Sequence, residues 1–240
     1  MQMSSLMLGL GVLTTGLAYG YLNWQVAAFV GYFSIMQGIH VVGYAVINDC
    51  SNPWNQIASY ANYLHVCFQP LVTGIGILGL MKYSGFDDKR SVERMMVVLF
   101  ISAVAGVMLS ARIVSGGMGP LSDVPGSCLW CGPPCSFQGE KHINFSLPLR
   151  VPNYVTPDLS LHFFLMFIPF LFVNGFTAAV SVVLFLTTAV PAYVHNIEST
   201  EAGTIWCFTS ILQTITVILL AVFARGDVSR GGVLKRILGK

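Results

Sequence analysis

The sequence predicts an all-α membrane protein: a polytopic helical bundle of about seven transmembrane helices, formed by a single membrane domain over residues 1–240. Two observations carry this prediction. Hydrophobic residues make up 55% of the 240 residues and charged residues only 9%, whereas a soluble domain carries about 25% charged residues. The apolar residues also fall into runs of about 20, the length that a membrane span needs. Lipid is therefore the expected main solvent, and a net charge of +2 leaves no basic patch for nucleic acid.

The apolar runs give seven candidate spans. They lie near residues 4–22, 26–48, 55–81, 95–115, 159–173, 175–193 and 203–224. The first has no basic residue before it, so we expect a retained helix rather than a signal peptide. Residues 159–193 could form one long helix, but its 35 residues would overshoot the bilayer. The turn signal Asn174-Gly175 in the middle favours two short helices.

Charge predicts the orientation of these spans. Asp49 is the only charged residue before Lys82, whereas residues 82–94 form a charged cluster and the tail from Arg225 is basic. With the 82–94 cluster in the cytoplasm, as the positive-inside rule requires, seven spans place the N-terminus outside and the C-terminus in the cytoplasm. The stretch at about 116–158, which holds seven of the eleven prolines, then becomes a long extracytoplasmic loop. The sequence leaves open which cellular membrane holds the protein.

Two consecutive spans each carry a stripe of polar side chains. Positions i, i+3 or i+4, and i+7 share one face of a helix. The stripes are Gln37, His40, Tyr44 and Asn48 in the second span, and Asn55, Asn62, His65 and Gln69 in the third. Because an unsatisfied polar group in hydrocarbon costs several kcal/mol, we expect the stripes to face each other or a shared cavity.

Histidines in and near these stripes predict a metal site. His40 and His65 lie at about the same depth, roughly 13–15 Å below the outer surface at 1.5 Å per residue, and His162 enters the fifth span from the same side. Imidazole suits Zn, Fe and Cu, so these three residues are candidate ligands of a transition metal ion or a haem. The alternative is that each histidine only holds two helices together by a hydrogen bond.

Other polar residues complete the predicted site. Gln37, Asn62 and Gln69 would orient the histidine ligands from behind. Asp49 or Glu201, near the outer ends of their spans, would handle protons as acid or base groups.

Proline and glycine mark where helices are expected to bend or to pack closely. Pro70 removes the hydrogen bond to the carbonyl of Val66, which bends the third span and frees an acceptor beside His65. The alternative is that proline is simply common in membrane helices. Close backbone approach is expected at the following glycines: Gly16, Gly20, Gly74, Gly76 and Gly79.

The cysteines on the predicted outer side suggest a disulfide. The candidates are Cys50, Cys128, Cys131 and Cys135, and an oxidising compartment would favour bridges among them, although their connectivity cannot be read from sequence. The competing interpretation is a metal site on the CxxC, but a zinc ribbon needs a second such pair, which is absent. Cys67 is expected to be buried and unreactive.

Two stretches resemble a family of small, uncharacterised multi-pass membrane proteins. They read "NDCSNPWNQ…YLHVCFQP" and "GEKHINFSLPLRVPNYVTPDLSLHFFLMFIPF", and the likeness covers residues 30–70 and 128–210. This resemblance implies a membrane fold and no particular activity. The chain also resembles, more weakly, the seven-helix zinc hydrolases of the alkaline ceramidase type, which use His, Asp and Ser within their helices. His40 and Asp49 are shared with that pattern, but the paired HxxxH of its last helix is absent.

Together these patterns predict a metal- or haem-dependent membrane enzyme that acts on a small or lipid-like substrate in a His-lined cavity near the extracytoplasmic side. The alternative is a non-catalytic accessory subunit of a larger membrane complex, which would hold a pigment or haem or only fill space. The expected partners are the lipid bilayer and, in the alternative, other membrane subunits. HExxH, GxSxG and Walker A motifs are absent.

Overall fold

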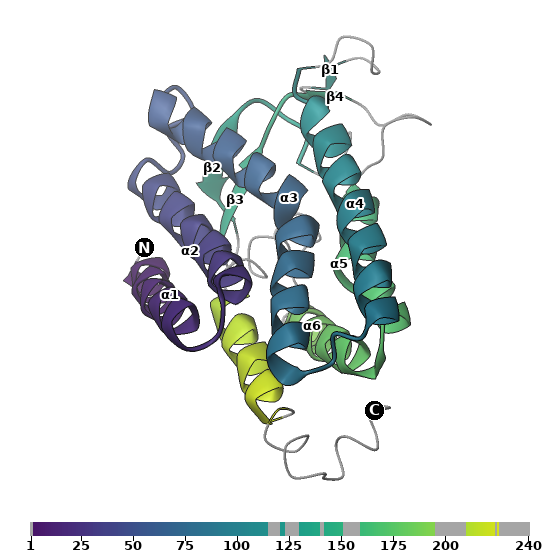
Figure 1. Cartoon of the computed structure of the whole chain (residues 1–240). Helices are drawn as coiled ribbons and strands as arrows, with labels where there is room; N and C mark the ends of the chain where they lie inside the picture. Colours follow the sequence, from purple (N-terminus) through teal and green to yellow (C-terminus); the bar gives the residue numbers. More distant parts are fainter. Residues whose placement is uncertain are drawn as a thin grey trace.

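The computed structural model describes residues 2–114, 121–122, 130–139, 142–150, 159–194, 210–223 and 225. Over these residues the chain is mostly helical (Figure 1). Four of the described helices are long and apolar enough to cross a membrane, and each lies at one of the first four predicted spans. They are α1 (Gln2–Tyr21), α2 (Trp24–Ala45), α3 (Pro53–Ser84) and α4 (Lys89–Ala111). The predicted helical architecture is therefore confirmed, and it fits an integral membrane protein.

Further apolar helices occupy the other predicted positions. They are α5 (Leu159–Phe167), the 3-10 helix η1 (Ile168–Phe172), α6 (Gly175–Val194) and the Ser210–Phe223 helix. The helical structure is interrupted at Asn174, between η1 and α6. Oδ1 of Asn174 caps α6 by accepting the N–H of Thr177 at 2.9 Å, and its Nδ2 donates to the carbonyl of Phe86 at 3.0 Å. The prediction of two short helices over residues 159–193 is confirmed.

Helix α4 begins six residues before the predicted span, at Lys89. Asp88 caps it: its Oδ1 accepts the N–H of Ser91 at 3.2 Å and its Oδ2 accepts the Ser91 hydroxyl at 2.6 Å. The same bonds hold the pKa of Asp88 below its usual value. The helix therefore extends beyond the predicted apolar span, because a capped helix can begin in a charged segment.

Consecutive helices pack against each other from α1 to α4, and α3 is the most buried of the four (Figure 1). A Cβ atom on Gly76 of α3 would lie 2.5 Å from the ring of Phe29 in α2, so this position needs glycine. Gly74 and Gly79 are similarly close to side chains of neighbouring helices. The expectation was wrong for Gly16 and Gly20, since no described atom lies within 4 Å of a Cβ built there.

Two small antiparallel sheets lie in the predicted extracytoplasmic loop. Strand β1 (Leu121–Ser122) pairs with β4 (Leu149–Arg150), and β2 (Cys135–Gln138) pairs with β3 (Ile143–Ser146). The all-α prediction missed them because strands of two to four residues leave no readable period in a Pro-rich segment. Figure 1 shows β2 and β3 beside the ends of α2 and α3 that meet at the turn between them.

Arg112 joins the end of α4 to this loop. Its side chain is only 1% exposed, its Nε donates to the carbonyl of Arg150 at 2.9 Å, and the Arg150 N–H donates to the Arg112 carbonyl at 3.0 Å. The loop is therefore fastened to the bundle at two places, α4 and the α2–α3 turn.

Candidate functional site

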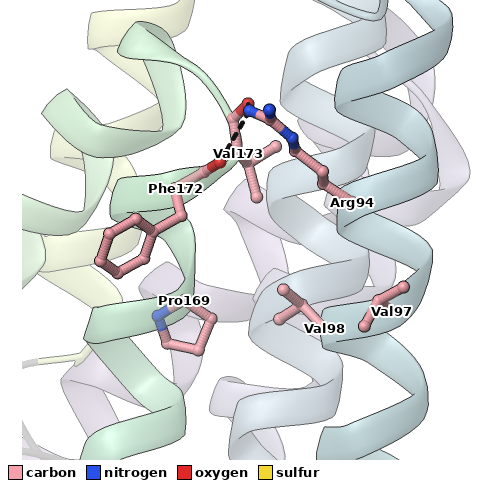
Figure 2. Close-up of a pocket in the computed structure, with 6 residues that line it drawn as sticks. All are labelled: Arg94, Val97, Val98, Pro169, Phe172 and Val173. Atoms are coloured by element: carbon pink, nitrogen blue, oxygen red, sulfur yellow. Dashed lines mark hydrogen bonds between the residues drawn. The ribbon is translucent and has the colours of Figure 1, made fainter.

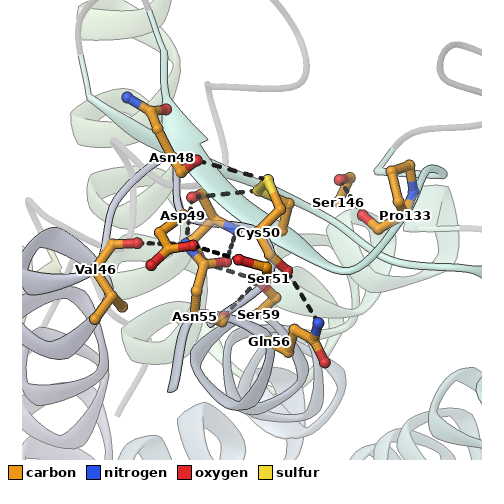
Figure 3. Close-up of a disulfide and its surroundings, with 12 residues drawn as sticks. Val46, Asn48, Asp49, Cys50, Ser51, Asn55, Gln56, Ser59, Pro133 and Ser146 are labelled. Atoms are coloured by element: carbon orange, nitrogen blue, oxygen red, sulfur yellow. Dashed lines mark hydrogen bonds between the residues drawn. A yellow bond between two sulfur atoms is a disulfide. The ribbon is translucent and has the colours of Figure 1, made fainter. Parts of the chain in front are cut away.

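Asn55 fastens the β2–β3 hairpin to the start of α3 (Figure 3). Its Nδ2 donates to the carbonyl of Val46 at 2.7 Å and to that of Ser136 at 2.8 Å, and its Oδ1 accepts the Ser136 N–H at 2.7 Å. The hydroxyl oxygens of Ser59 and Ser136 are 2.9 Å apart. The first residue of the α3 stripe thus holds the hairpin rather than lining a cavity.

The end of α2 makes matching contacts with the hairpin. The hydroxyl of Tyr44 accepts the N–H of Ile143 at 3.1 Å, and Oδ1 of Asn48 accepts the N–H of Gln138 at 2.9 Å. The Ile143 side chain also packs onto Gly43, where a Cβ would lie 2.8 Å from it. Both polar stripes therefore end in contacts with the hairpin.

A disulfide between Cys50 and Cys135 closes this assembly covalently, across 85 positions of sequence (Figure 3). Cys131 is also disulfide-bonded, and Cys128 lies outside the described residues. Cys67 is free and buried. The prediction of at least one disulfide among the candidate cysteines, and of a buried Cys67, is confirmed.

The hairpin brings His142 to His40. The two ring centroids are 5.2 Å apart, with the ring planes at 60°. His40 is completely buried, and neither of its ring nitrogens has a hydrogen bond of good geometry to a residue that the structure describes. Asn62 is also completely buried and lies beside the His40 ring, but no hydrogen bond of good geometry reaches either of its amide atoms within the described residues.

Both ring nitrogens of His65 are hydrogen bonded, Nε2 to α2 and Nδ1 to a residue of its own helix, α3. Its Nε2 lies 2.8 Å from the carbonyl oxygen of Tyr32 and its Nδ1 lies 3.3 Å from Nε2 of Gln69. The Tyr32 hydroxyl donates to the His65 carbonyl at 2.7 Å, and the two rings stack with centroids 4.0 Å apart. A carbonyl can only accept and an amide NH₂ can only donate, which assigns the ring proton to Nε2 of His65. A metal ion would have to displace one of these bonds.

His162 of α5 is hydrogen bonded to the backbone of Val66 in α3. Pro70 lies inside α3 and has no N–H to offer the Val66 carbonyl four residues earlier. That carbonyl is therefore left for the histidine, and α3 changes direction near its middle in Figure 1. The predicted role of Pro70, which was to free an acceptor beside His65, is confirmed.

Four histidines thus form a row through the bundle, which we call the histidine row: His142, His40, His65 and His162. His40 lies within electrostatic range of both His142 and His65, and His162 within range of His65. The described residues contain no group of three or more His, Cys, Asp or Glu side chains that could hold one metal ion. The predicted three-histidine centre at His40, His65 and His162 is therefore unsupported.

The predicted orienting amides are divided between two places. Gln37, Asn62 and Gln69 are all completely buried. Gln69 supports His65 as expected, whereas Asn62 lies beside His40. Gln37 lies one turn before His40 on α2.

Of the two predicted proton-handling carboxylates, the structure describes Asp49, which does not belong to the row. Asp49 lies on the exposed α2–α3 turn, where its carboxylate accepts the Ser51 hydroxyl at 2.8 Å and Nδ2 of Asn52 at 3.3 Å. These bonds lower the pKa of Asp49, which makes it a weaker base. Glu201 lies outside the described residues.

His142 and Tyr32 are the site residues that sequence reasoning missed. His142 belongs to a loop with no periodicity, so only its chemistry could have linked it to the buried histidines. Tyr32 lies eight positions before His40, on the same face of α2, and could have been added to the polar stripe on that ground.

Comparison with known proteins places the chain in a family. The sequence model of a family of unknown function (DUF5765) matches residues 2–229, so the chain belongs to this family. No curated protein and no solved structure matches the chain. The likeness to the seven-helix zinc hydrolases therefore gains no support.

Proposed function

We propose that this member of the DUF5765 family is an integral membrane protein that holds a transition metal ion at His40 and His142 and uses it in a reaction on a small or lipid-like substrate. One observation carries the proposal: His40 and Asn62 lie side by side, completely buried, and no hydrogen bond of good geometry to described residues satisfies their polar atoms. Leaving a buried polar group unsatisfied costs about 1–3 kcal/mol, and proteins pair more than 90% of such groups. A bound ion would offset this cost.

The spacing of the two imidazoles suits a shared ion. Nitrogen–metal bonds of about 2.0–2.1 Å put the ring centroids of two imidazoles about 5 Å apart on a tetrahedral ion, and the observed separation is 5.2 Å. The amide oxygen of Asn62 is a further donor beside His40. Two histidines leave coordination positions open for water or substrate, which is typical of catalytic rather than structural sites.

A bare ion suits this place better than a haem. His40 and Asn62 are covered completely by surrounding protein atoms, and a single ion would displace far fewer of these atoms than a haem would. A haem would have to separate α2 from α3, which are joined by the Tyr32–His65 contacts.

The proposal includes the seven-span arrangement with the N-terminus outside. The described helices at all seven predicted positions support it. The Cys50–Cys135 disulfide supports the orientation independently, because disulfides persist in oxidising compartments. The hairpin would then lie outside the cytoplasm, with residues 82–94 at the opposite end of α3.

The test is metal analysis of the full-length protein, purified in mild detergent without chelators. We expect about one transition metal ion per chain in the wild type and a loss of at least tenfold in His40→Gln and in His142→Gln. The matched control is His65→Gln, which should retain the metal while lowering the melting temperature, because it removes the bonds to Tyr32.

These outcomes distinguish a metal ligand from a residue that only stabilises the fold. Loss of metal in His65→Gln with retention in His40→Gln would overturn the assignment. Metal-free wild-type protein that no added Zn, Fe or Cu ion stabilises would overturn the proposal and favour the accessory-subunit alternative.

A further inference from the structure

A groove of about 580 Å³ runs between α4 and η1, near the start of α4 (Figure 2). Apart from Arg94, the side chains that line it are apolar: Val97, Val98, Pro169, Phe172 and Val173. Two of these side chains are strongly exposed, Val97 at 59% and Phe172 at 72%. In a membrane protein such a groove faces the acyl chains of lipid rather than water.

Arg94 lies at one end of this groove and is only partly used by the protein. Its Nη1 donates to the carbonyls of Phe172 at 3.0 Å and Val173 at 3.2 Å, which are left over at the end of η1 (Figure 2). A guanidinium has five N–H donors, and the remaining ones make no hydrogen bond to a described residue. The side chain is exposed, so these donors are open to a ligand.

Arg94 lies where the charged surface at the start of α4 meets the apolar groove. Lys89 and Arg90 are exposed on the preceding turn. Glu93 is 4.0 Å from Lys89, and Asp88 is occupied by Ser91, so neither carboxylate is bonded to Arg94. A cation at one end and a long apolar groove beyond it match a lipid with an anionic headgroup.

We propose that this groove binds an anionic phospholipid, with its phosphate on Arg94 and one acyl chain along Val97, Pro169 and Phe172. The phosphate accepts hydrogen bonds from the Arg94 N–H donors that do not bond to η1, because arginine binds phosphate through paired N–H donors. Anionic lipids concentrate in the cytoplasmic leaflet, where positive-inside orientation would put this end of α4. The lipid site shares no residue with the histidine row, so the lipid proposal can be tested independently of the metal proposal.

The experiment titrates full-length protein in detergent with dioleoylphosphatidylglycerol and, separately, with dioleoylphosphatidylcholine, and reads each Kd by native mass spectrometry. We expect the anionic lipid to bind at least tenfold more tightly. Arg94→Gln should abolish this preference, whereas Arg90→Gln, which removes the same charge one turn earlier, should keep most of it.

A second variant guards against misfolding of Arg94→Gln, which also loses the bonds to η1. Val97→Trp fills the groove and leaves Arg94 in place, so it should weaken both lipids by several fold with an unchanged melting temperature. The proposal is overturned if both lipids bind equally to the wild type, if Arg94→Gln keeps the preference, or if glycerol 3-phosphate alone competes as well as the lipid, since the acyl groove would then contribute nothing.

Discussion

Asn55 and Asn62 are both completely buried on the same face of α3, yet they differ in their bonds. Every polar atom of the Asn55 side chain is hydrogen bonded, to Val46 and Ser136. Neither amide atom of Asn62 has a hydrogen bond of good geometry within the described residues. Position on a helix face could be predicted for both from spacing alone. The hydrogen-bond partner of Asn55 could not be predicted, because Ser136 belongs to a loop 81 positions away.

Asn55→Ala should release the hairpin. The change leaves the backbone N–H of Ser136 without its partner, at about 1–3 kcal/mol for a buried group, and removes one of the two donors to the Ser136 carbonyl, which still accepts the Asn48 N–H at 3.1 Å. We expect the melting temperature to fall and the amide of Ser136 to exchange its hydrogen faster. Asn62→Ala is the matched control, and it should change the stability of metal-free protein little. An equal loss of stability in both variants would contradict the distinction between them.

At the scale of one helix, α3 combines a bend with a bond to a neighbour. Pro70 frees the Val66 carbonyl, and His162 takes it. The sequence predicted the bend and the free acceptor because both follow from the missing N–H of proline. It could not predict that His162 would be the donor, since the path of α5 depends on the whole bundle.

Pro70→Ala should uncouple the two helices. Alanine restores an N–H that gives the Val66 carbonyl a partner within α3, so His162 should lose its role as donor. We expect His162→Leu to destabilise the wild type more than it destabilises Pro70→Ala, with an interaction energy of about 0.5–3 kcal/mol in a double-mutant cycle of unfolding free energies. Strict additivity of the two changes would show that the bond to Val66 is unrelated to the proline.

Gly76→Ala should destabilise the contact between α3 and α2. The new methyl group meets Phe29 at 2.5 Å, and overpacking of this kind costs about 1–3 kcal/mol. Gly20→Ala is the matched control, because no described atom lies within 4 Å of its Cβ position. Thermal unfolding of both variants checks this, and a tolerant Gly76 would mean that α2 and α3 pack less closely than described.

At the scale of the whole molecule, the apolar runs predicted where the helices lie, because lipid demands about 20 apolar residues whatever the fold. The His40–His142 pair was missed for the opposite reason. The hairpin is placed by Asn55, Asn48 and a disulfide, and these contacts leave no periodic trace in the loop.

The proposed orientation predicts which loops face outward. In sealed membranes whose extracytoplasmic face is outward, Gln138→Cys on the hairpin should react with a membrane-impermeant maleimide, whereas Asp87→Cys, between α3 and α4, should react only after permeabilisation. Both positions are exposed, so neither should be shielded by packing. Labelling of both positions from one side would refute the seven-span arrangement.

The most direct test of the central claim is the X-ray absorption spectrum of the metal-loaded full-length protein. The account predicts nitrogen and oxygen ligands with the scattering pattern of two imidazoles, reduced to one in His142→Gln. A spectrum dominated by sulfur, or one that His40→Gln and His142→Gln leave unchanged, would contradict it.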